Sequence, residues 1–66
     1  MEISYKPLWK TMIQRKITTY ALIHKYNFNA RTIYNLKHNQ SITMHTLKKL
    51  CEILDCKPND IIEFVE

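Results

Sequence analysis

Apolar residues recur along this chain at the three- and four-residue spacing of amphipathic helices, and short polar segments separate one run from the next. The first run places Leu8, Trp9, Met12 and Ile13 on one apolar stripe. The fourth run is clear, because Leu47, Leu50 and Leu54 would share one face of a helix. The spacing therefore predicts five short helices. They are expected at about 7–15, from Thr18 to Asn27, from Asn29 to about His38, from Thr43 to about Leu54, and from Lys57 to about Ile61.

The ends of these helices must be closed without glycine, which the chain lacks. Asn tolerates the left-handed backbone conformation that ends helices, so Asn27 and Asn39 are predicted to close the second and third helices. Thr18, Asn29 and Thr43 stand just before apolar runs, where a side-chain oxygen can accept a hydrogen bond from the first turn. Polar residues thus mark the boundaries of the central helices.

The two ends of the chain differ from this helical body. Ile3 and Tyr5 alternate with polar residues near the N-terminus, and Phe64 and Val65 follow the last helix. Strands this short are stable only when they pair, so the two ends are expected to meet. The predicted fold is all-α: a compact domain of five helices, with a short two-stranded ribbon available to join the termini.

A length of 66 residues allows one small domain spanning 1–66, and 45% hydrophobic residues suffice for a core. No apolar run approaches the roughly 18 residues that cross a membrane, and the N-terminus lacks the features of a signal peptide. We therefore expect a cytoplasmic protein with no membrane partner. Cys51 and Cys56 are expected to be reduced there, since a five-residue separation beginning inside a helix is poor geometry for a disulfide bond.

Charge is distributed unevenly along the chain. No acidic residue lies between Glu2 and Glu52, where average composition would place about six, and the tail after residue 51 holds five acids against Lys57 alone. A strongly positive body selects a polyanion as its partner. The nine basic residues of the acid-free stretch are Lys6, Lys10, Arg15, Lys16, Lys25, Arg31, Lys37, Lys48 and Lys49.

The connection between the second and third predicted helices is short. Only Asn27, Phe28 and Asn29 separate them, which fits two helices that cross steeply but not two that pack side by side. Phe28 is expected to pack in this elbow against both helices. Such a helix-turn-helix, at about 18–38, buries one side of its second helix and exposes the other. The exposed side would carry Ala30, Arg31, Tyr34, Asn35 and His38, a set suited to base edges and phosphates.

With this motif in place, the chain resembles the lambda-repressor/Cro-type helix-turn-helix family, also called the xenobiotic-response-element family. The resemblance runs from about Leu8 to Ile62. It is carried by Ile17-Thr18-Thr19 at the start of the second helix, by Phe28 in the turn, and by the ending LKKLCEILDCKPNDIIEFV. It implies a lambda-repressor-like DNA-binding domain of five helices, with the helix at about 30–38 as the recognition helix in the major groove.

Three positions depart from the usual pattern of that family. Thr19 stands where a Gln usually anchors the second helix to a phosphate, and the shorter side chain reduces the reach. Ile23 fills a site that is usually Ala, which implies a wider crossing of the two helices. Asn27 replaces the usual turn Gly, a milder change because Asn can adopt the same backbone conformation.

The expected function is sequence-specific binding of double-stranded DNA by a transcriptional regulator. One recognition helix covers too few base pairs to select a site, so a homodimer on a palindrome is expected. Arg31 would contact either a guanine or a phosphate, and Tyr34 either a thymine methyl group or a dimer partner. The expected DNA-binding residues are Thr19, Asn29, Ala30, Arg31, Tyr34, Asn35, Lys37 and His38.

Two other functions stay open. A small protein-interaction module, such as an antitoxin-like or phage-encoded partner, could use a helical face, but such a face would not need nine cations without an acid. RNA binding is less favoured, because no aromatic stacking platform is visible. An enzyme is not expected, since there is no acidic cluster and no glycine-rich phosphate loop, and neither is a cofactor or a small-molecule substrate. The histidines and cysteines match no zinc spacing, so no metal site is expected.

Overall fold

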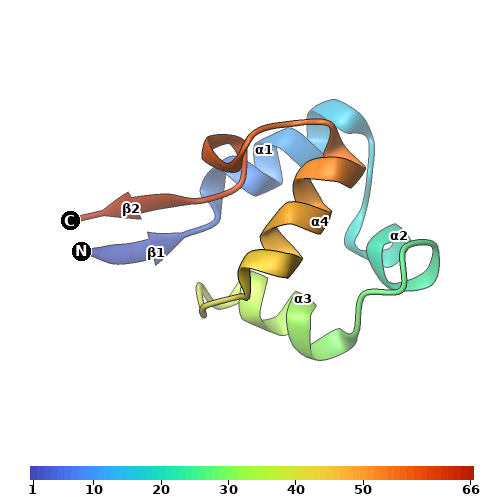
Figure 1. Ribbon diagram of the computed structural model, residues 1–66, viewed down its shortest axis with the longest axis horizontal. Coiled ribbons are helices and arrows are strands. Elements are labelled where there is room, and N and C mark those ends of the chain that lie inside the picture. Colours follow the sequence, from blue (N-terminus) through green and yellow to red (C-terminus); the bar gives the residue numbers. More distant parts are fainter.

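A computed structural model describes residues 1–66, and its helices surround one apolar core. The elements are β1 (Glu2–Ser4), α1 (Lys6–Arg15), α2 (Thr19–His24), α3 (Ala30–Lys37), α4 (Met44–Leu54), the 3-10 turn η1 (Pro58–Asp60) and β2 (Glu63–Val65). In the view of Figure 1, α4 lies between α1 and α3, and the β1–β2 ribbon projects from one end with both termini at its tip. None of the helices has the length and apolar character needed to span a membrane.

The prediction of a fifth helix is wrong, because residues 58–60 form only a single 3-10 turn and the fold has four α-helices. The turn is closed by the backbone N–H groups of Ile61 and Ile62, which both donate to the carbonyl oxygen of Pro58 at 3.0 Å. Ile61 is fully buried, and Glu63 already pairs in β2. Too few residues separate the buried Ile61 from the strand for an α-helix to continue.

The three predicted N-caps are confirmed. The side-chain oxygens of Thr18, Asn29 and Thr43 each accept a hydrogen bond from the backbone N–H three residues later, at 2.8–3.1 Å. Asn27 and Asn39 adopt the left-handed conformation, with φ of 61° and 56°, as their positions predict. The helices around the turn therefore begin at local hydrogen bonds, and Asn27 and Asn39 turn the chain after α2 and α3 have ended.

No sequence signal marks two further left-handed residues, Lys16 and Asp55, which end α1 and α4 with φ of 58° and 51°. Apart from Gly, Asn and Asp, residues rarely adopt this conformation, because their Cβ atom clashes with the backbone. The strain at Lys16 must therefore be offset by other interactions. The N–H of Ile17 donates across it to the carbonyl of Met12 at 3.0 Å, which completes the hydrogen-bonded end of α1. Lys16 thus takes the place that glycine usually fills in helix ends of this kind.

The core takes its residues from every helix. In α1, Leu8 and Met12 are buried, and the buried Thr11 between them donates its hydroxyl to the carbonyl of Asp60 at 2.8 Å. Ile13, predicted on the apolar stripe of this helix, is instead 78% exposed, because the face centred on Leu8 and Met12 turns it toward solvent. The core residues are Tyr5, Leu8, Met12, Leu22, Phe28, Ile33, Leu36, Leu50, Leu54 and Ile61.

Two side chains tie distant segments to this core. Tyr5 is fully buried, its hydroxyl donates to the carbonyl of Gln40 at 2.6 Å, and its backbone N–H donates to the side-chain oxygen of Asn39 at 3.3 Å. Arg15 donates from its guanidinium to the carbonyls of Leu54 and of the next residue, at 2.9 and 3.1 Å. The N-terminus therefore holds the loop between α3 and α4, and α1 caps the C-terminal end of α4.

The predicted ribbon between the termini is confirmed. β1 and β2 pair antiparallel, with Ile3 opposite Phe64 and Glu2 opposite Val65. Ile3 packs at the edge of the core, whereas Phe64 stays 64% exposed. Because the sheet has only two strands, each strand keeps one edge without a partner.

Replacement of Phe28 by Ala is expected to destabilise the protein by about 3–5 kcal/mol, because its buried ring would leave a cavity at the elbow of the motif. For a small domain this loss approaches the whole free energy of unfolding. Chemical denaturation followed by circular dichroism measures the change. Ile13→Ala, at an exposed apolar position, is the matched control and should shift the free energy of unfolding by less than about 0.5 kcal/mol. A Phe28→Ala protein as stable as the wild type would contradict this role.

Candidate nucleic-acid interface

The chain leaves α2 early. The helix ends at His24 and not at the predicted Asn27, because the N–H groups of Lys25 and Tyr26 both donate to the carbonyl of Ala21, at 2.8 and 3.3 Å. One acceptor shared by two donors tightens the last turn and ends the regular α-helical pattern. The connection to α3 is consequently longer than the three residues that the sequence pattern indicates.

Phe28 anchors this connection in the core. Its side chain is 6% exposed, and its N–H donates to the carbonyl of Leu22 at 2.9 Å. The left-handed Asn27 precedes the ring and the N-cap Asn29 follows it, so the backbone turns sharply on both sides of a buried residue. The start and the direction of α3 are therefore set by one anchored ring.

α3 has one buried and one exposed face, as predicted. Ile33 and Leu36 are 5% and 0% exposed and belong to the core. Asn35 lies at the border of the two faces and is half-buried, and its carbonyl accepts the N–H of Gln40 at 2.8 Å. The other predicted residues of this helix and its C-cap are exposed: Ala30, Arg31, Tyr34, Lys37 and His38.

Three of the exposed side chains lie in contact along α3. The guanidinium carbon of Arg31 lies 5.5 Å from the centroid of the Tyr34 ring, and the His38 ring lies with its centroid 4.1 Å from that of Tyr34. The ring planes of Tyr34 and His38 are inclined by 34°. Spacings of three and four residues place the three side chains in one row on the helix surface.

The two remaining predicted residues lie at helix starts. Asn29 caps α3, and its side-chain oxygen accepts the N–H of Thr32 at 2.8 Å, which leaves its amide NH2 group available to donate outward. Thr19 is the first residue of α2 and is half-buried next to the cap Thr18. The fold thus gathers Arg31, Tyr34 and His38 into one contact group and leaves Thr19 on the neighbouring helix.

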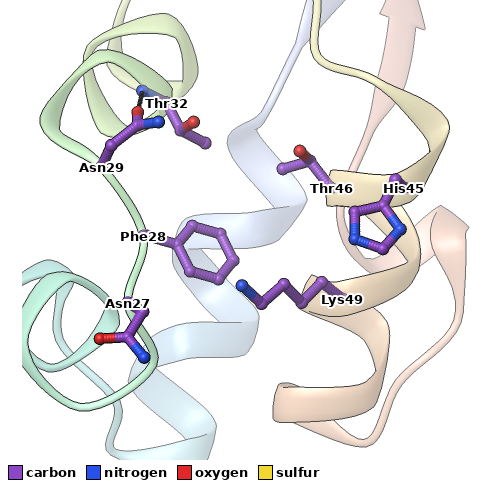
Figure 2. A pocket seen from close by; sticks show the side chains of 7 residues that line it. All are labelled: Asn27, Phe28, Asn29, Thr32, His45, Thr46 and Lys49. Atoms are coloured by element: carbon purple, nitrogen blue, oxygen red, sulfur yellow. Dashed lines mark hydrogen bonds between the residues drawn. The ribbon is translucent and has the colours of Figure 1, made fainter.

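A polar cavity of about 140 Å³ opens between the α2–α3 turn and the first turns of α4 (Figure 2). Lys49 extends toward the turn, with its Nζ atom 4.9 Å from the centroid of the Phe28 ring, a cation–π contact. The sequence pattern indicates Lys49 only as one of nine cations and indicates no site at His45 or Thr46. The lining residues are Asn27, Phe28, Asn29, Thr32, His45, Thr46 and Lys49.

The two cysteines lie at the C-terminal end of α4. The N–H of Cys56 donates to the carbonyl of Cys51 at 3.0 Å, and both thiols are free. Burial raises the pKa of both thiols, that of Cys56 to about 11. Both thiols are therefore protonated near neutral pH, which makes them weak nucleophiles. No group of three or more His, Cys, Asp or Glu side chains is placed to hold a metal ion.

Comparison with known proteins agrees with this geometry. The sequence profile of the Cro/C1-type HTH DNA-binding domain matches residues 7–66. The chain belongs to this family. Its structure is similar to the crystal structure of the transcriptional regulator VanUg, form II, with a TM-score of 0.85 and 32% sequence identity over 94% of this chain and 83% of that chain. No curated protein sequence matches this Cro/C1-type chain significantly.

The raised thiol pKa values predict that this Cro/C1-type domain loses stability in alkali. An unfolded Cys56 would ionise near the ordinary pKa of 9.0, whereas the folded one ionises only near about 11, so the unfolded state releases its proton first. The contribution of this thiol is fully present below pH 9 and is lost as the pH rises through about 11. Melting temperatures measured between these limits should fall less in Cys56→Ala than in the wild type. Identical pH dependence in both proteins would refute the effect.

Proposed function

We propose that this protein is a transcriptional regulator that binds double-stranded DNA in a sequence-specific manner, with α3 in the major groove. The observation that carries the proposal is a polar helix face that points outward from a fixed elbow, on a surface whose sequence has no acid between Glu2 and Glu52. From α1 to the second turn of α4, the chain itself offers only cations and neutral groups to phosphates. Family membership and the similar regulator structure support the same function.

The residues of the proposed interface form two groups according to their position. On the exposed face of α3, Arg31 is suited to the O6 and N7 acceptors of guanine, Asn35 to adenine, and the methyl group of Ala30 to a thymine methyl group. Residues at the margin of this face or on the neighbouring helix are suited to contact phosphates. Such contacts fix the position of the helix on the duplex. The proposed phosphate contacts are Thr19, Asn29, Lys37 and His38.

The cavity beside α3 extends the proposed phosphate surface. Lys49 is half-buried and lies over the Phe28 ring, so its ammonium group is held near the start of α3. The amide of Asn29 and the ring of His45 lie on opposite sides of the same opening, as Figure 2 shows. These donors would bind one backbone phosphate of a strand that passes along this flank of the helix.

Binding to duplex DNA is expected to weaken steeply as the salt concentration rises, because bound cations displace counterions that are condensed on the DNA. With about four to six phosphate contacts per domain, the slope of log affinity against log salt should be about −4 to −5. Fluorescence anisotropy of a labelled duplex over a series of salt concentrations gives this slope. A salt-independent affinity, or none for any duplex, would reject DNA binding and favour a protein partner.

Arg31→Ala is expected to weaken binding to the preferred site by about 1–3 kcal/mol and to relax the preference at one base pair. Lys37→Ala should weaken all duplexes alike, because a phosphate contact carries no base information. Affinities of both variants for the preferred site and for single-base variants of it separate the two effects. If the two substitutions behave alike, Arg31 contacts only a phosphate.

We also propose that the protein acts as a homodimer that is joined through the terminal ribbon. The free edge belongs to a ribbon on which Phe64 and Val65 are 64% and 39% exposed. A second copy of β2 paired antiparallel about Phe64 would place the two Phe64 rings opposite each other and Glu63 opposite Val65, so that no carboxylates face one another. Such pairing would cover the open edge and its apolar side chains together.

Phe64→Asp is expected to shift the protein from dimer to monomer, because it puts two carboxylates at the centre of the proposed strand pair. Sedimentation equilibrium measures the dissociation constant. Ile13→Asp makes the same chemical change at another exposed apolar position and should leave the dimer intact. An undiminished dimer in Phe64→Asp would exclude the ribbon as the interface.

A further inference from the structure

Tyr34 lies between two other side chains on the exposed face of α3. Arg31 stands three residues before it and His38 four residues after it, so the two reach the ring from opposite ends of the helix. The guanidinium carbon is 5.5 Å and the imidazole centroid 4.1 Å from the centre of the Tyr34 ring. Between these two neighbours, the side chain of Tyr34 is 50% exposed.

Arg31 is the residue that this arrangement changes most. A free Arg side chain on a helix surface samples many rotamers, whereas a cation–π contact with an aromatic ring restricts the positions of its guanidinium group. The N–H donors point outward around the guanidinium plane, so a contact on one side of the group leaves donors available. A guanine contact requires two parallel N–H bonds to O6 and N7 and therefore depends on this orientation. A contact with a phosphate depends less on the orientation of the guanidinium group.

We propose that Tyr34 is a positioning residue for base recognition. Its ring holds Arg31 in the orientation that forms a bidentate contact with guanine, and His38 supports the ring from the other side. Tyr34 therefore determines the preference at one base pair through Arg31 and makes no base contact of its own. This inference rests on the proposed binding of DNA by α3.

The chain contains a matched control for this arrangement. Tyr20 and His24 on α2 form a similar pair, with ring centroids 4.2 Å apart and an inclination of 34°. The residue three positions before Tyr20 is Ile17, so this pair has no cation to hold. Tyr20→Leu removes a tyrosine–histidine stack of the same geometry without any effect on Arg31.

The test begins with selection of the preferred duplex from a random pool. Affinities are then measured for the four duplexes that differ at the base pair whose preference Arg31→Ala relaxes. Tyr34→Leu should lower the preference for guanine at this position by about two- to fivefold, the effect of an exposed cation–π contact, with the affinity for unrelated DNA unchanged. Tyr34→Phe, which keeps the ring, and Tyr20→Leu should both retain the wild-type preference.

A double substitution shows whether Tyr34 acts through Arg31. In the Arg31→Ala background, Tyr34→Leu should cause no further loss of preference, because no guanidinium remains to be oriented. An equal loss in both backgrounds would overturn the inference, since it would mean that the ring itself contacts DNA. Loss of the preference in Tyr34→Phe would overturn it as well, because the hydroxyl would then be the active group.

A measurement without DNA separates this inference from the proposed function. In the free protein, the ring current of Tyr34 should shift the NMR signals of the Arg31 side chain, and the shift should persist in Tyr34→Phe and vanish in Tyr34→Leu. Absent shifts together with intact specific binding would overturn the positioning role alone. Normal shifts in a protein that binds no duplex would overturn the proposed function and, with it, the inference.

Discussion

The burial of Phe28 at the elbow between α2 and α3 is the contact on which the proposed functional surface depends. Its ring belongs to the core, its N–H is bonded to Leu22, and the residues on either side of it reverse and restart the chain. A helix that starts next to an anchored residue has a defined direction. The outward face of α3 therefore has a fixed orientation relative to α2. Lys49 lies over the same ring.

The polar interactions that stabilise the fold use groups away from this face. Arg15 is engaged with the last carbonyls of α4, and Tyr5 with the loop before that helix. α4 begins on the α3 side of the molecule and ends near α1 in Figure 1, and the carbonyl of Asp55 just after its end accepts a hydrogen bond from Arg15 of α1 at 3.1 Å. The separation of charge along the chain is thus partly kept in space: the acids after α4 begin at the α1 side, whereas Glu2 of the ribbon lies beside His38 at the end of α3.

The predictions from sequence that held depend on local physics. A cap such as Thr18 or Asn29 acts on an N–H three residues away, and a left-handed Asn acts on its own turn, so neighbouring residues suffice to recognise both. The predictions that failed concern competition between local preference and burial. Ile13 fits a helical stripe but lies outside the face that packs on the core. The segment after Pro58 forms only one 3-10 turn, because Ile61 is buried and the residues that follow it form β2.

The sequence by itself determined the capped starts of α2, α3 and α4, the buried position of Phe28, the family and the acid-free positive body, because each depends on residue type and short-range spacing. Only the tertiary structure decided that Lys16 adopts a left-handed conformation and that His45 and Lys49 lie beside the turn at Phe28. These features join residues far apart in the chain, or impose an unfavourable conformation that packing elsewhere compensates. Their energies depend on contacts that exist only after α1, α3 and α4 have packed, so a local sequence pattern cannot predict these features.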